Sequence, residues 1–449
     1  MKLLLFAQIL AIVLPGVFSD NMVFQQGRDI PVWGQAAASE TVNVVLSNEA
    51  DGNVVAKTKV KADKQGNWSV NLPALKAEGQ SLKLTVSGKK EKAEYSNIAV
   101  GEVWVCSGQS NMAYEMRRSW QAAPRKGEDL ATLELQKPAN PMIRVFFSGR
   151  GGNSWKVADG TSIAPVSAAG YFFAKNLSEA LGVPVGIISA ASGGSAIEQW
   201  LPDGMLYKFQ LQPCAPFAVA GFLWYQGETN CSQKDHEYVE KFQTLTSAWR
   251  TDFKAPDAPF FTVMLCPHTF SDRLHRGSQV TSEELPFFWQ QQIRATKEIP
   301  NCDIISLTDL VDNLEDIHPS YKWIVGERLA NIALAKHYKV EGAAEYSGPR
   351  AVSKRIEGGK VVVKFEHAEG LKARANSVEP NSNAQVKWFE VAGADKAWRQ
   401  ALATVSGENE VSVFHPDVPN PVYVRYAWRE TAQPNLFNAA GLPTFPFEL

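Results

Sequence analysis

Four polar segments of the chain combine residue types that could attack a carbonyl group and stabilise the charge that develops on it. A serine hydroxyl, a pair of glycines, a side-chain amide and a histidine beside carboxylates are the parts of an acyl-transfer site. The segments are GQSNM (108–112), SGGSAIEQW (192–200), WYQGETN (224–230) and EDIHP (315–319). Each has an ordinary structural explanation when taken alone, but four of them beyond successive strand-like runs indicate one shared site.

Ser110 and His318 are the expected nucleophile and base of that site. Ser110 follows the apolar run VWVC (103–106) on a tight turn, which would expose its hydroxyl above a sheet. A helix that began at this turn would direct N–H groups at an oxyanion, or the serine could simply cap that helix. The hydrolase elbow G-x-S-x-G is absent, since Met112 replaces its second glycine. A histidine between an acidic residue and a proline can accept the serine proton while a carboxylate orients its ring.

The other two segments offer hydrogen-bond donors. Gly193 and Gly194 allow close approach of the backbone and can present an N–H group to an oxyanion, although an ordinary turn would use them equally well. Gln226 offers a side-chain amide, while Glu228 and Asn230 can brace the loop or contact substrate. These polar groups directly follow the aromatic end of a strand-like run, and they are difficult to explain as core residues.

Alternating strands and helices must position these segments. Apolar residues at helical spacing predict helices over 171–181, 236–253 and 321–337. Strands that alternate with helices imply a parallel sheet covered on both faces, with its site beyond the carboxyl ends of the strands. The expected strands are VWVC (103–106), MIRVFF (142–147), VGIISA (185–190), GFLWY (221–225), FFTVML (260–265) and DIISL (303–307).

Regions rich in β-strands are expected on both sides of this α/β region. Short alternating runs separated by turns predict a small sandwich near the start of the chain, and the same pattern returns after residue 341. The apolar run Leu3–Leu14 behind one lysine predicts an export signal, with a buried first strand as the alternative. We therefore expect a signal segment (1–14), an N-terminal β domain (15–100), a catalytic domain (101–341) and a C-terminal β domain (342–449). The protein would be periplasmic or extracellular.

Charge and composition argue against several partners and cofactors. The formal net charge is −2 without a long basic run, so nucleic acid is not an expected partner. No later apolar run approaches the roughly 18 residues of a membrane span. The seven histidines and five cysteines lack metal-ligand spacing, so neither a metal nor another cofactor is expected. Cys214 and Cys231 could form one disulfide, whereas Cys266 and Cys302 lie at opposite ends of the predicted sheet and should not pair.

The combination of segments resembles the sialate O-acetylesterase family within the SGNH hydrolase superfamily. The matching stretches follow the family's order: FSDNMVFQQ (18–26), PVWG (31–34), GEVWVCSGQSNM (101–112), GGSAIEQW (193–200), WYQGETN (224–230), DIHPSYKWIVGERLA (316–330) and YAWRETAQPNLFNAAGLPTFPF (426–447). The resemblance implies a three-layer α/β/α domain with a parallel sheet, flanked by sandwich-like β domains. It also implies a serine esterase that removes acetyl groups from sialic acids through an acetyl-enzyme.

The resemblance also assigns roles to single residues. Ser110 would be the nucleophile and His318 the general base. Asp316 would orient His318, with Glu315 as the alternative because many superfamily members place the acid three residues before the histidine. The oxyanion donors would be the N–H of Ser110, an N–H of the glycine pair 193–194, and the amide of Gln226 where the superfamily usually has asparagine. The expected substrate contacts are Gln109, Asn111, Trp200 and Glu228.

Further aromatic and basic residues could recognise the sugar. Tyr225 and Trp120 could stack on a sugar ring as Trp200 could, although packing is the commoner role of such residues at a strand end. A sialate carboxylate would need an arginine fork, and segment 268–285 lacks periodicity and could form a lid. The candidates for the fork are Arg117, Arg118, Arg273 and Arg276, and the spare histidines are His268 and His275.

Three other functions share these features. A deacetylase for a cell-wall polysaccharide such as acetylated xylan would use the same triad with a different cleft. A carbohydrate-binding protein with an inert hydrolase domain would lack a catalytic residue, yet Ser110, Asp316 and His318 are all present. A lipase-like esterase would accept long acyl chains. The sequence does not indicate an oligomeric state.

Overall fold

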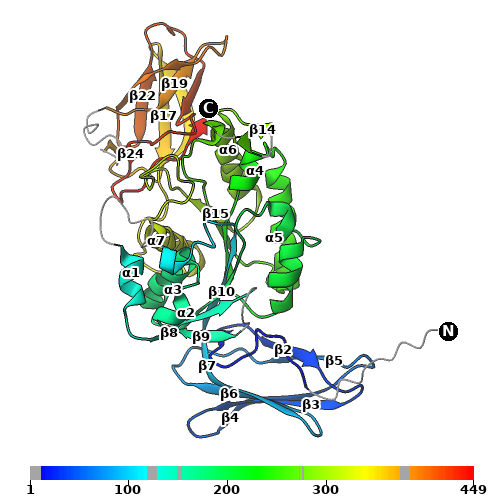
Figure 1. Cartoon of the computed structure of the whole chain (residues 1–449). Helices are drawn as coiled ribbons and strands as arrows, with labels where there is room; N and C mark the ends of the chain where they lie inside the picture. The colour runs from blue at the N-terminus through cyan, green and yellow to red at the C-terminus, as the bar shows by residue number, and fades with distance from the viewer. Residues whose placement is uncertain (1–11, 119–128, 149–153, 273, 276–277, 375–384) are drawn as a thin grey trace, which may run out of the picture.

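The chain forms three regions that follow one another along an elongated molecule (Figure 1). The computed structural model describes residues 12–118, 129–148, 154–272, 274–275, 278–374 and 385–449. A β region formed by the first part of the chain lies at one end, an α/β region lies in the middle, and a second β region lies at the other end. The α/β region contains all four polar segments.

The middle region is built on a sheet with the strand order β15-β12-β11-β7-β10-β8-β9. Neighbouring strands are parallel except for the β8–β9 pair. Every residue of β11, β12 and β15 is buried, as expected for a sheet covered on both faces. The strands are β7 (Lys92–Gly108), β8 (Asn140–Phe147), β9 (Trp155–Ala158), β10 (Val185–Ala191), β11 (Gly221–Tyr225), β12 (Phe260–Val263) and β15 (Cys302–Ile305).

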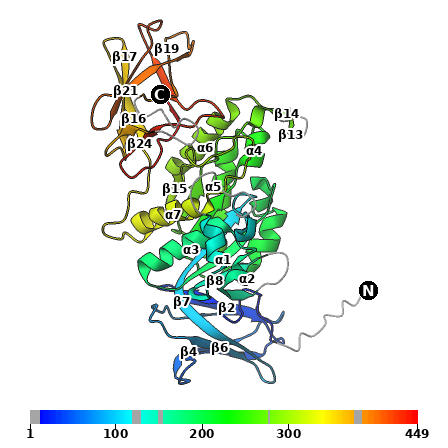
Figure 2. The ribbon, with the colours of Figure 1, turned by 60° about the vertical axis from the view of Figure 1, so that its left-hand side comes forward.

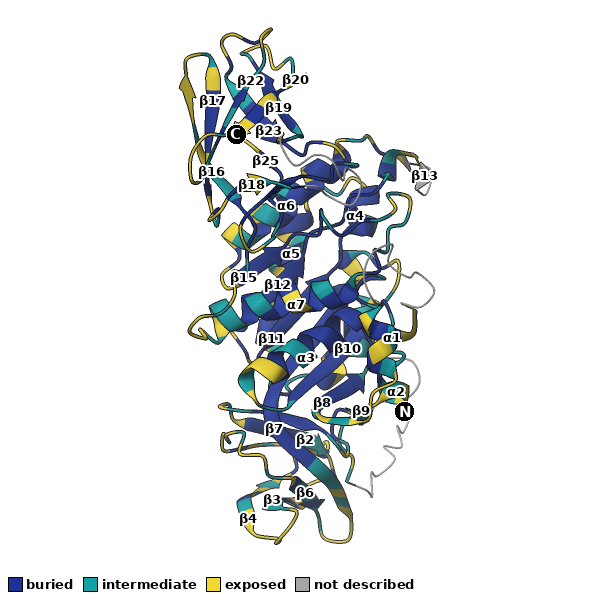
Figure 3. Cartoon of the chain, turned by 90° about the vertical axis from the view of Figure 1, so that its left-hand side faces the viewer, coloured by how far each residue is buried: buried dark blue, intermediate teal, exposed yellow. Residues whose placement is uncertain are grey.

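Helices cover both faces of this sheet, and α3 and α7 are seen on the near face in Figure 3. Side chains alternate along β7, so Val103 and Val105 enter one core cluster while Trp104 and Cys106 enter the other. The first cluster contains residues of α5 and α6, and the second contains residues of α3 and α7. This arrangement confirms the predicted three-layer architecture. The long helices are α3 (Ala168–Leu181), α5 (Tyr238–Asp252), α6 (Glu284–Glu298) and α7 (Lys322–Ile332).

The predicted helices are therefore present, with small differences at their ends. Helix α3 begins earlier than predicted because Ser167 caps it, and it ends at Gly182 in the left-handed conformation (φ 68°). Helix α7 continues as a π-helical turn over Ala333–His337. The shorter elements are α1 (Leu130–Leu135), α2 (Gly160–Ile163), α4 (Glu228–Ser232), a π-helical turn (Tyr207–Leu211), three 3-10 turns (Ile197–Trp200, Gln212–Cys214, Phe270–Asp272) and the hairpin β13 (Leu274–His275) and β14 (Ser278–Gln279).

Strand β7 joins the N-terminal β region to the central sheet, as its course in Figure 2 shows. Its first part pairs with β6, and its second part pairs with β10 and β11. The predicted boundary between residues 100 and 101 thus falls inside one continuous strand rather than in a linker. The strands of this region are β1 (Val23–Gln25), β2 (Ile30–Gln35), β3 (Thr41–Asn48), β4 (Val54–Lys61), β5 (Asn67–Leu72) and β6 (Leu82–Ser87).

The C-terminal β region is sandwich-like, as predicted. Two four-stranded antiparallel sheets, β16-β17-β22-β21 and β20-β19-β23-β25, share one hydrophobic core, and β18 pairs with β24. The strands are β16 (Arg350–Glu357), β17 (Lys360–Glu366), β18 (Lys372–Ala373), β19 (Phe389–Ala392), β20 (Arg399–Gln400), β21 (Leu402–Val405), β22 (Glu410–Phe414), β23 (Tyr423–Tyr426), β24 (Leu436–Phe437) and β25 (Phe447–Glu448).

All five cysteines are free and buried. The disulfide considered for Cys214 and Cys231 is therefore not formed, and Cys266 and Cys302 are unpaired as the parallel topology predicts. Residues 1–11 of the expected signal segment lie outside the described residues, and Val13 forms an isolated bridge with Gln35. Within the described ranges, no helix has both the length and the apolar character needed to cross a membrane.

The contact between α3 and α7 gives a test of the packing. A Cβ atom added at Gly326 would lie 2.6 Å from the Cβ of Phe172 and 2.7 Å from the carbonyl oxygen of Ala169. We expect Gly326→Ala to lower the free energy of unfolding by about 1–3 kcal/mol, because the helices must separate. In a helix without this contact, the same change would raise stability by roughly 1 kcal/mol. Urea denaturation measures the difference, with Glu327→Ala on the exposed side of α7 as the control.

Candidate active site

The carboxyl ends of the central strands bring Ser110 and His318 together. Strand β7 lies between β10 and β11, so the loops that follow these three strands meet at one edge of the sheet. The loop after β15 reaches the same edge and carries the histidine. The Nε2 atom of His318 lies 2.8 Å from the Oγ atom of Ser110, within hydrogen-bond distance. The nucleophile and base predicted from sequence are thus in contact.

Gly108 explains how the serine turn is formed. Its φ angle is 141°, and a Cβ atom at this position would lie 2.1 Å from the carbonyl oxygen of Tyr225. That carbonyl instead accepts a hydrogen bond from the N–H of Gln109. The turn closes with a bond from the N–H of Ala113 to the Gln109 carbonyl, and no α-helix begins here. The helix considered for this position is therefore absent, and a single turn leaves the Ser110 side chain partly exposed.

Asp316 is the carboxylate beside the base. Its Oδ1 atom accepts a hydrogen bond of 2.9 Å from the backbone N–H of His318 and lies 3.7 Å from the Nδ1 atom of the ring. The His318 side chain, followed by this backbone bond, holds the pKa of Asp316 below its ordinary value, while partial burial acts in the opposite direction. Glu315 is exposed.

Asn111 ties the serine turn to the histidine loop. Its side-chain nitrogen donates to Glu228 Oε1 at 2.6 Å and to the carbonyl of Ile317 at 2.9 Å. Its side-chain oxygen accepts a bond of 2.7 Å from Lys322 Nζ, which also donates to the Pro319 carbonyl at 2.6 Å. Ile317 and Pro319 lie on either side of His318. Ile317 is therefore bonded directly to Asn111, the residue next to Ser110, and Pro319 is linked to Asn111 through Lys322. We call Asn111, Glu228 and Lys322 the buried network.

The electrostatics of this network are unusual because its members are excluded from water. Burial lowers the pKa of Lys322 to about 8, and nearby acidic groups only partly oppose this effect. Burial also raises the pKa of Glu228, although the hydrogen bond from Asn111 favours its ionised form. The rings of Tyr114 and Tyr225 lie 4.9 and 5.4 Å from Lys322 Nζ and provide cation–π contacts. Lys322 and Glu228 thus both bond to the side-chain amide of Asn111, the residue next to Ser110.

Two glutamines organise the loop after β11. The Gln226 amide donates to Gln109 Oε1, to the Ser195 carbonyl and to Asn230 Oδ1, and the residue is fully buried. Its donors are used within the protein, so the predicted oxyanion role of Gln226 is wrong. Gln109 Oε1 also accepts from the N–H groups of Gly227 and Thr229. Its amide nitrogen has no acceptor among the described residues, and Gln109 lines a small cavity beside the serine.

The glycine pair lies against the nucleophile. A Cβ atom added at Gly193 would lie 3.7 Å from the Cβ atom of Ser110, while Gly194 has a φ angle of 69° and open space around it. In the described part of the chain, the N–H groups of Ser110, Gly193 and Gly194 donate to no backbone carbonyl. Gly194 lines the same cavity of about 200 Å³, together with Gln109, Glu228, Thr229, Ser232, Gln233 and Ile317. These N–H groups are thus available to a ligand.

Several predicted substrate contacts are wrong or fall outside the described residues. Trp200 is completely buried, packs on Trp224 and Trp249, and donates to Ser195 Oγ, so it cannot stack on a sugar. Asn111 is also fully buried and acts within the buried network instead. Tyr225 is buried too. Trp120, Arg273 and Arg276 lie outside the described residues, as does the side chain of His275.

The remaining basic candidates do not converge on the serine. Arg117 is exposed and forms an ion pair of 2.7 Å with Glu115, and Arg118 is exposed as well. His268 is buried, with its Nδ1 atom 2.8 Å from the Leu314 carbonyl. In the part of the chain that the structure describes, no group of three histidine, cysteine, aspartate or glutamate side chains could hold a metal ion.

Sequence reasoning missed Lys322 and the true role of Asn111. Lys322 stands at the first position of α7, where a lysine is normally solvated, and its partner Asn111 lies 211 residues away in the chain. No local pattern signals such a pair. The only sequence clue is that the lysine follows the catalytic histidine by four residues, within one turn of a helix entry.

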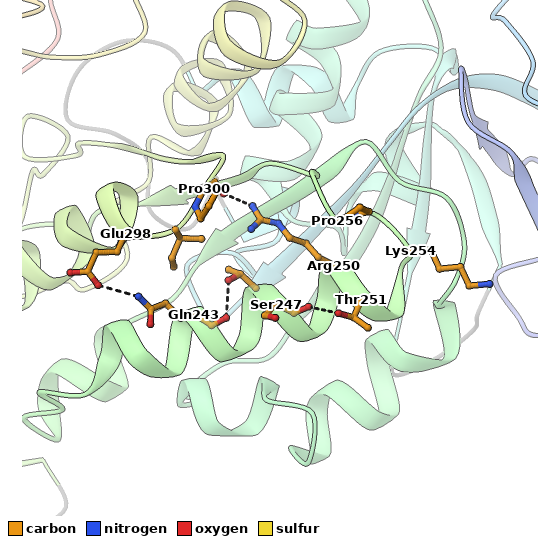
Figure 4. A pocket seen from close by; sticks show the side chains of 10 residues that line it. Gln243, Ser247, Arg250, Thr251, Lys254, Pro256, Glu298 and Pro300 are labelled. Atoms are coloured by element: carbon orange, nitrogen blue, oxygen red, sulfur yellow. Dashed lines mark hydrogen bonds between the residues drawn. The ribbon is translucent and has the colours of Figure 1, made fainter.

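A second pocket, shown in Figure 4, lies away from these residues. It is formed by α5 and by the segments that precede β12 and β15, and these segments are at the amino ends of their strands. Within it, Arg250 donates to the carbonyls of Ala258 and Pro300 at 2.9 and 2.6 Å. Arg250 thus braces two chain segments at the edge of the sheet opposite to Ser110, and the pocket is not part of the active site.

Comparison with known proteins agrees with this geometry. Residues 100–335 match the family model described as "Carbohydrate esterase, sialic acid-specific acetylesterase". The chain belongs to this family. The family resemblance predicted from sequence is confirmed, and the protein is a carboxylic ester hydrolase of the carbohydrate esterase type.

Full-length relatives extend the match beyond the catalytic region. The sialate O-acetylesterases of Homo sapiens and Pongo abelii are each 23% identical over 507 residues, which cover 96% of this chain and 91% of the relative. A solved carbohydrate acetylesterase from Xanthomonas citri is 29% identical and superimposes with a TM-score of 0.84 over 98% of this chain and 99% of that one. This chain and the Xanthomonas citri protein therefore share all three regions of the fold.

The lowered pKa of Lys322 gives a test of the buried network. The pKa is about 8 in the folded protein against an ordinary 10.5, so between these values the unfolded chain binds more protons than the folded one. The stability contributed at this site therefore rises as the pH increases through that window, and it is constant below it. We expect the unfolding free energy of the wild type to increase relative to that of Lys322→Met across this range.

Urea denaturation at a series of pH values measures this difference. Lys297→Met, which removes an exposed lysine of α6, is the control and should give a curve parallel to that of the wild type. Parallel curves for the wild type and Lys322→Met would show that Lys322 does not lose its proton in this window and would contradict a lowered pKa for this lysine.

Proposed function

We propose that the protein is a serine esterase that removes O-acetyl groups from sialic acids, with Ser110 as the nucleophile and His318 as the base. The observation that carries the proposal is the 2.8 Å contact between these two side chains in a member of the carbohydrate esterase family. The relatives that align with 96% of the chain are named sialate O-acetylesterases, which supports the choice of sugar.

The reaction proceeds in two displacements. Ser110 Oγ forms a bond to the acetyl carbonyl carbon while its proton passes to His318 Nε2. The tetrahedral intermediate then collapses, the bond to the sugar oxygen breaks, and His318 returns the proton to that oxygen. A water molecule, deprotonated by His318, next attacks the carbonyl carbon of the acetyl-enzyme. The bond from this carbon to Ser110 Oγ then breaks, His318 returns the proton to Oγ, and acetate is released. Asp316 stabilises the imidazolium at both stages, and it is preferred over Glu315 because its carboxylate lies beside the ring.

Backbone N–H groups stabilise the oxyanion in this proposal. The N–H of Ser110 and one N–H of the glycine pair 193–194 supply two donors without any side-chain movement. Gln109 supplies a third from its amide nitrogen, because three donors hold its carbonyl end while the residue lines the cavity. Each such donor typically contributes about 3–4 kcal/mol to transition-state stabilisation. Glu228 acts from beneath the site through Asn111.

The cavity and the intact catalytic pair weigh against two alternatives. The cavity of about 200 Å³ that Gln109 and Gly194 share is lined mainly by polar residues, which offer little favourable contact to the long apolar chain that a lipase accepts. A carbohydrate-binding protein with an inert domain would have no reason to keep Ser110 and His318 at hydrogen-bond distance. Export to the periplasm or the exterior is part of the proposal and rests on the apolar run Leu3–Leu14.

Deacetylation of a neutral polysaccharide is the second candidate. The solved relative from Xanthomonas citri is named only as a carbohydrate acetylesterase, yet at 29% its identity to this chain exceeds the 23% of the sialate O-acetylesterases. The same Ser110–His318 pair would perform the chemistry. Only the sugar that the surrounding surface accepts would change.

Acetate release tests both candidates. Wild type and Ser110→Ala are compared on O-acetylated sialic acid and on acetylated xylan, with Ser69→Ala on an exposed strand position as the control. We expect release from the sialate to fall by about four orders of magnitude or more in Ser110→Ala, because loss of the nucleophile removes most of the catalysis. The control should match the wild type.

Acetate release from the two substrates distinguishes the two candidate functions. Ser110-dependent release from xylan without release from the sialate would retain the nucleophile and replace the substrate. Activity that persists at the wild-type rate in Ser110→Ala on either substrate would reject the assigned nucleophile.

A further inference from the structure

A pocket in the C-terminal β region has the chemistry of a sugar-binding site. It encloses about 320 Å³ and lies apart from Ser110, on the sheet formed by β19, β20 and β23. Three tryptophans line it together with two arginines and a glutamate. These lining residues are Trp388, Trp398, Trp428, Arg399, Arg429 and Glu390, and we call this site the tryptophan pocket. Indole rings provide flat apolar surfaces of the kind on which sugar rings stack.

A buried arginine holds two of these indoles in place. The guanidinium of Arg425 lies 4.3 Å from the ring centroid of Trp398 and 5.6 Å from that of Trp428. The same guanidinium donates to Glu390 at 2.6 Å and to Glu283 at 3.2 Å, and Arg425 is 4% exposed. Both rings are therefore fixed before any ligand arrives. A preformed aromatic surface loses little conformational freedom on binding.

The third tryptophan has a strained backbone. Trp388 has a φ angle of 71°, in the left-handed region that bulky residues avoid. Its carbonyl accepts a bond of 2.9 Å from the N–H of Ala427, which also has a positive φ angle of 57°. Strain of this kind is concentrated at ligand-binding positions, where it directs a side chain. It is a second observation, independent of the lining residues, that marks this pocket.

The charges around the pocket favour an anionic ligand. Arg399 is exposed, and the side chain of Arg429 is 49% exposed at 3.7 Å from Glu390. The negative charge of Glu390 is already bonded to the buried Arg425. Lys396, also exposed, adds a further positive charge near Tyr423 beside Trp398. Arginine side chains can bind a carboxylate with two parallel hydrogen bonds.

We propose that the tryptophan pocket binds a carboxylate-bearing sugar of the glycan that carries the substrate. The sugar ring stacks on an indole face while Arg399 and Arg429 bind the carboxylate. The inference rests on the proposed function, which supplies sialic acid as the sugar, but the pocket is a binding site separate from the one where the ester is cleaved.

Hydrogen bonds of Glu430 connect the tryptophan pocket to the catalytic region. Glu430, directly after the pocket residue Arg429, has a backbone N–H that donates to the Ser282 carbonyl and a side chain that accepts from the Ser271 N–H at 2.9 Å. The Glu430 carbonyl accepts from the N–H of His268. These residues belong to the segment that follows β12, at the carboxyl edge of the sheet. A glycan held in the tryptophan pocket is therefore held at a fixed position relative to the catalytic loops.

The test uses full-length Ser110→Ala protein, so that binding is measured without turnover. The probe is sialyllactose, which carries no acetyl ester, and lactose is its neutral counterpart. We expect calorimetry or ligand-detected NMR to show binding of sialyllactose in preference to lactose. Replacing Arg399 and Arg429 together by serine should weaken that binding at least tenfold, whereas Lys364→Ser, at an exposed position of β17 outside the pocket, should leave it unchanged.

A second variant tests the aromatic surface of the pocket without changing the charge of the protein. In the Ser110→Ala protein, Trp398→Phe keeps an aromatic ring over Arg425 but reduces the stacking surface, so it should weaken sialyllactose binding. In protein that retains Ser110, the same change should leave cleavage of a small chromogenic acetate ester unchanged. Equal binding of lactose, no binding of sialyllactose, or full binding by the double arginine variant would each overturn the proposal. Because the probe has no ester, a failure to hydrolyse acetylated sialic acid would reject the proposed function without producing any of these results.

Discussion

The hydrogen bonds of the Asn111 side chain are the interaction on which the active site depends. Ser110 and His318 are 208 residues apart in the chain, and a serine can act as the proposed nucleophile only when its histidine lies within hydrogen-bond distance. Asn111 is adjacent to Ser110 and bonds to the Ile317 carbonyl, while Lys322 links the Asn111 oxygen to the Pro319 carbonyl. His318 lies between those two carbonyls. One amide thus connects the loops that carry Ser110 and His318.

This arrangement has a cost because it buries charge. Lys322 and Glu228 are both removed from water, and each is bonded to Asn111 rather than directly to the other. Removing one member of such a group typically costs about 3–5 kcal/mol, since it leaves a buried charge without a partner. The surrounding fold supplies the required stability through two hydrophobic clusters that fill both faces of the sheet. The rigidity of the sheet in turn keeps the loop ends in register.

Much of this organisation could be predicted from the sequence, for a physical reason. Each strand of a doubly covered parallel sheet is an uninterrupted apolar run, so its end is visible as the point where polar residues begin. This rule predicts Ser110, Gly193 and His318 beyond strand ends, and the topology places all three at one edge of the sheet. The need for glycine at position 108 is visible only in the structure, where its positive φ angle and the nearby Tyr225 carbonyl admit no side chain.

The errors concern the direction in which side chains point. Trp200 and Gln226 stand in the predicted loops, but one turns into an aromatic core and the other bonds to Gln109 and Asn230. Their neighbours in space come from distant parts of the chain, and a linear pattern does not contain that information. Strand β7 likewise crosses the expected domain boundary. The sequence of an apolar strand does not indicate which sheet the strand joins, so its pairing with both β6 and β10 could not be predicted.

Covalent labelling of the serine tests the central claim most directly. A fluorophosphonate reacts with a serine whose proton is removed by a neighbouring base, and mass spectrometry of the peptides identifies the labelled residue. The structure predicts a single label on Ser110 and a labelling rate at least about a hundredfold lower in His318→Ala, because general base catalysis contributes that much or more. A label on another residue, or an unchanged rate in His318→Ala, would contradict the account.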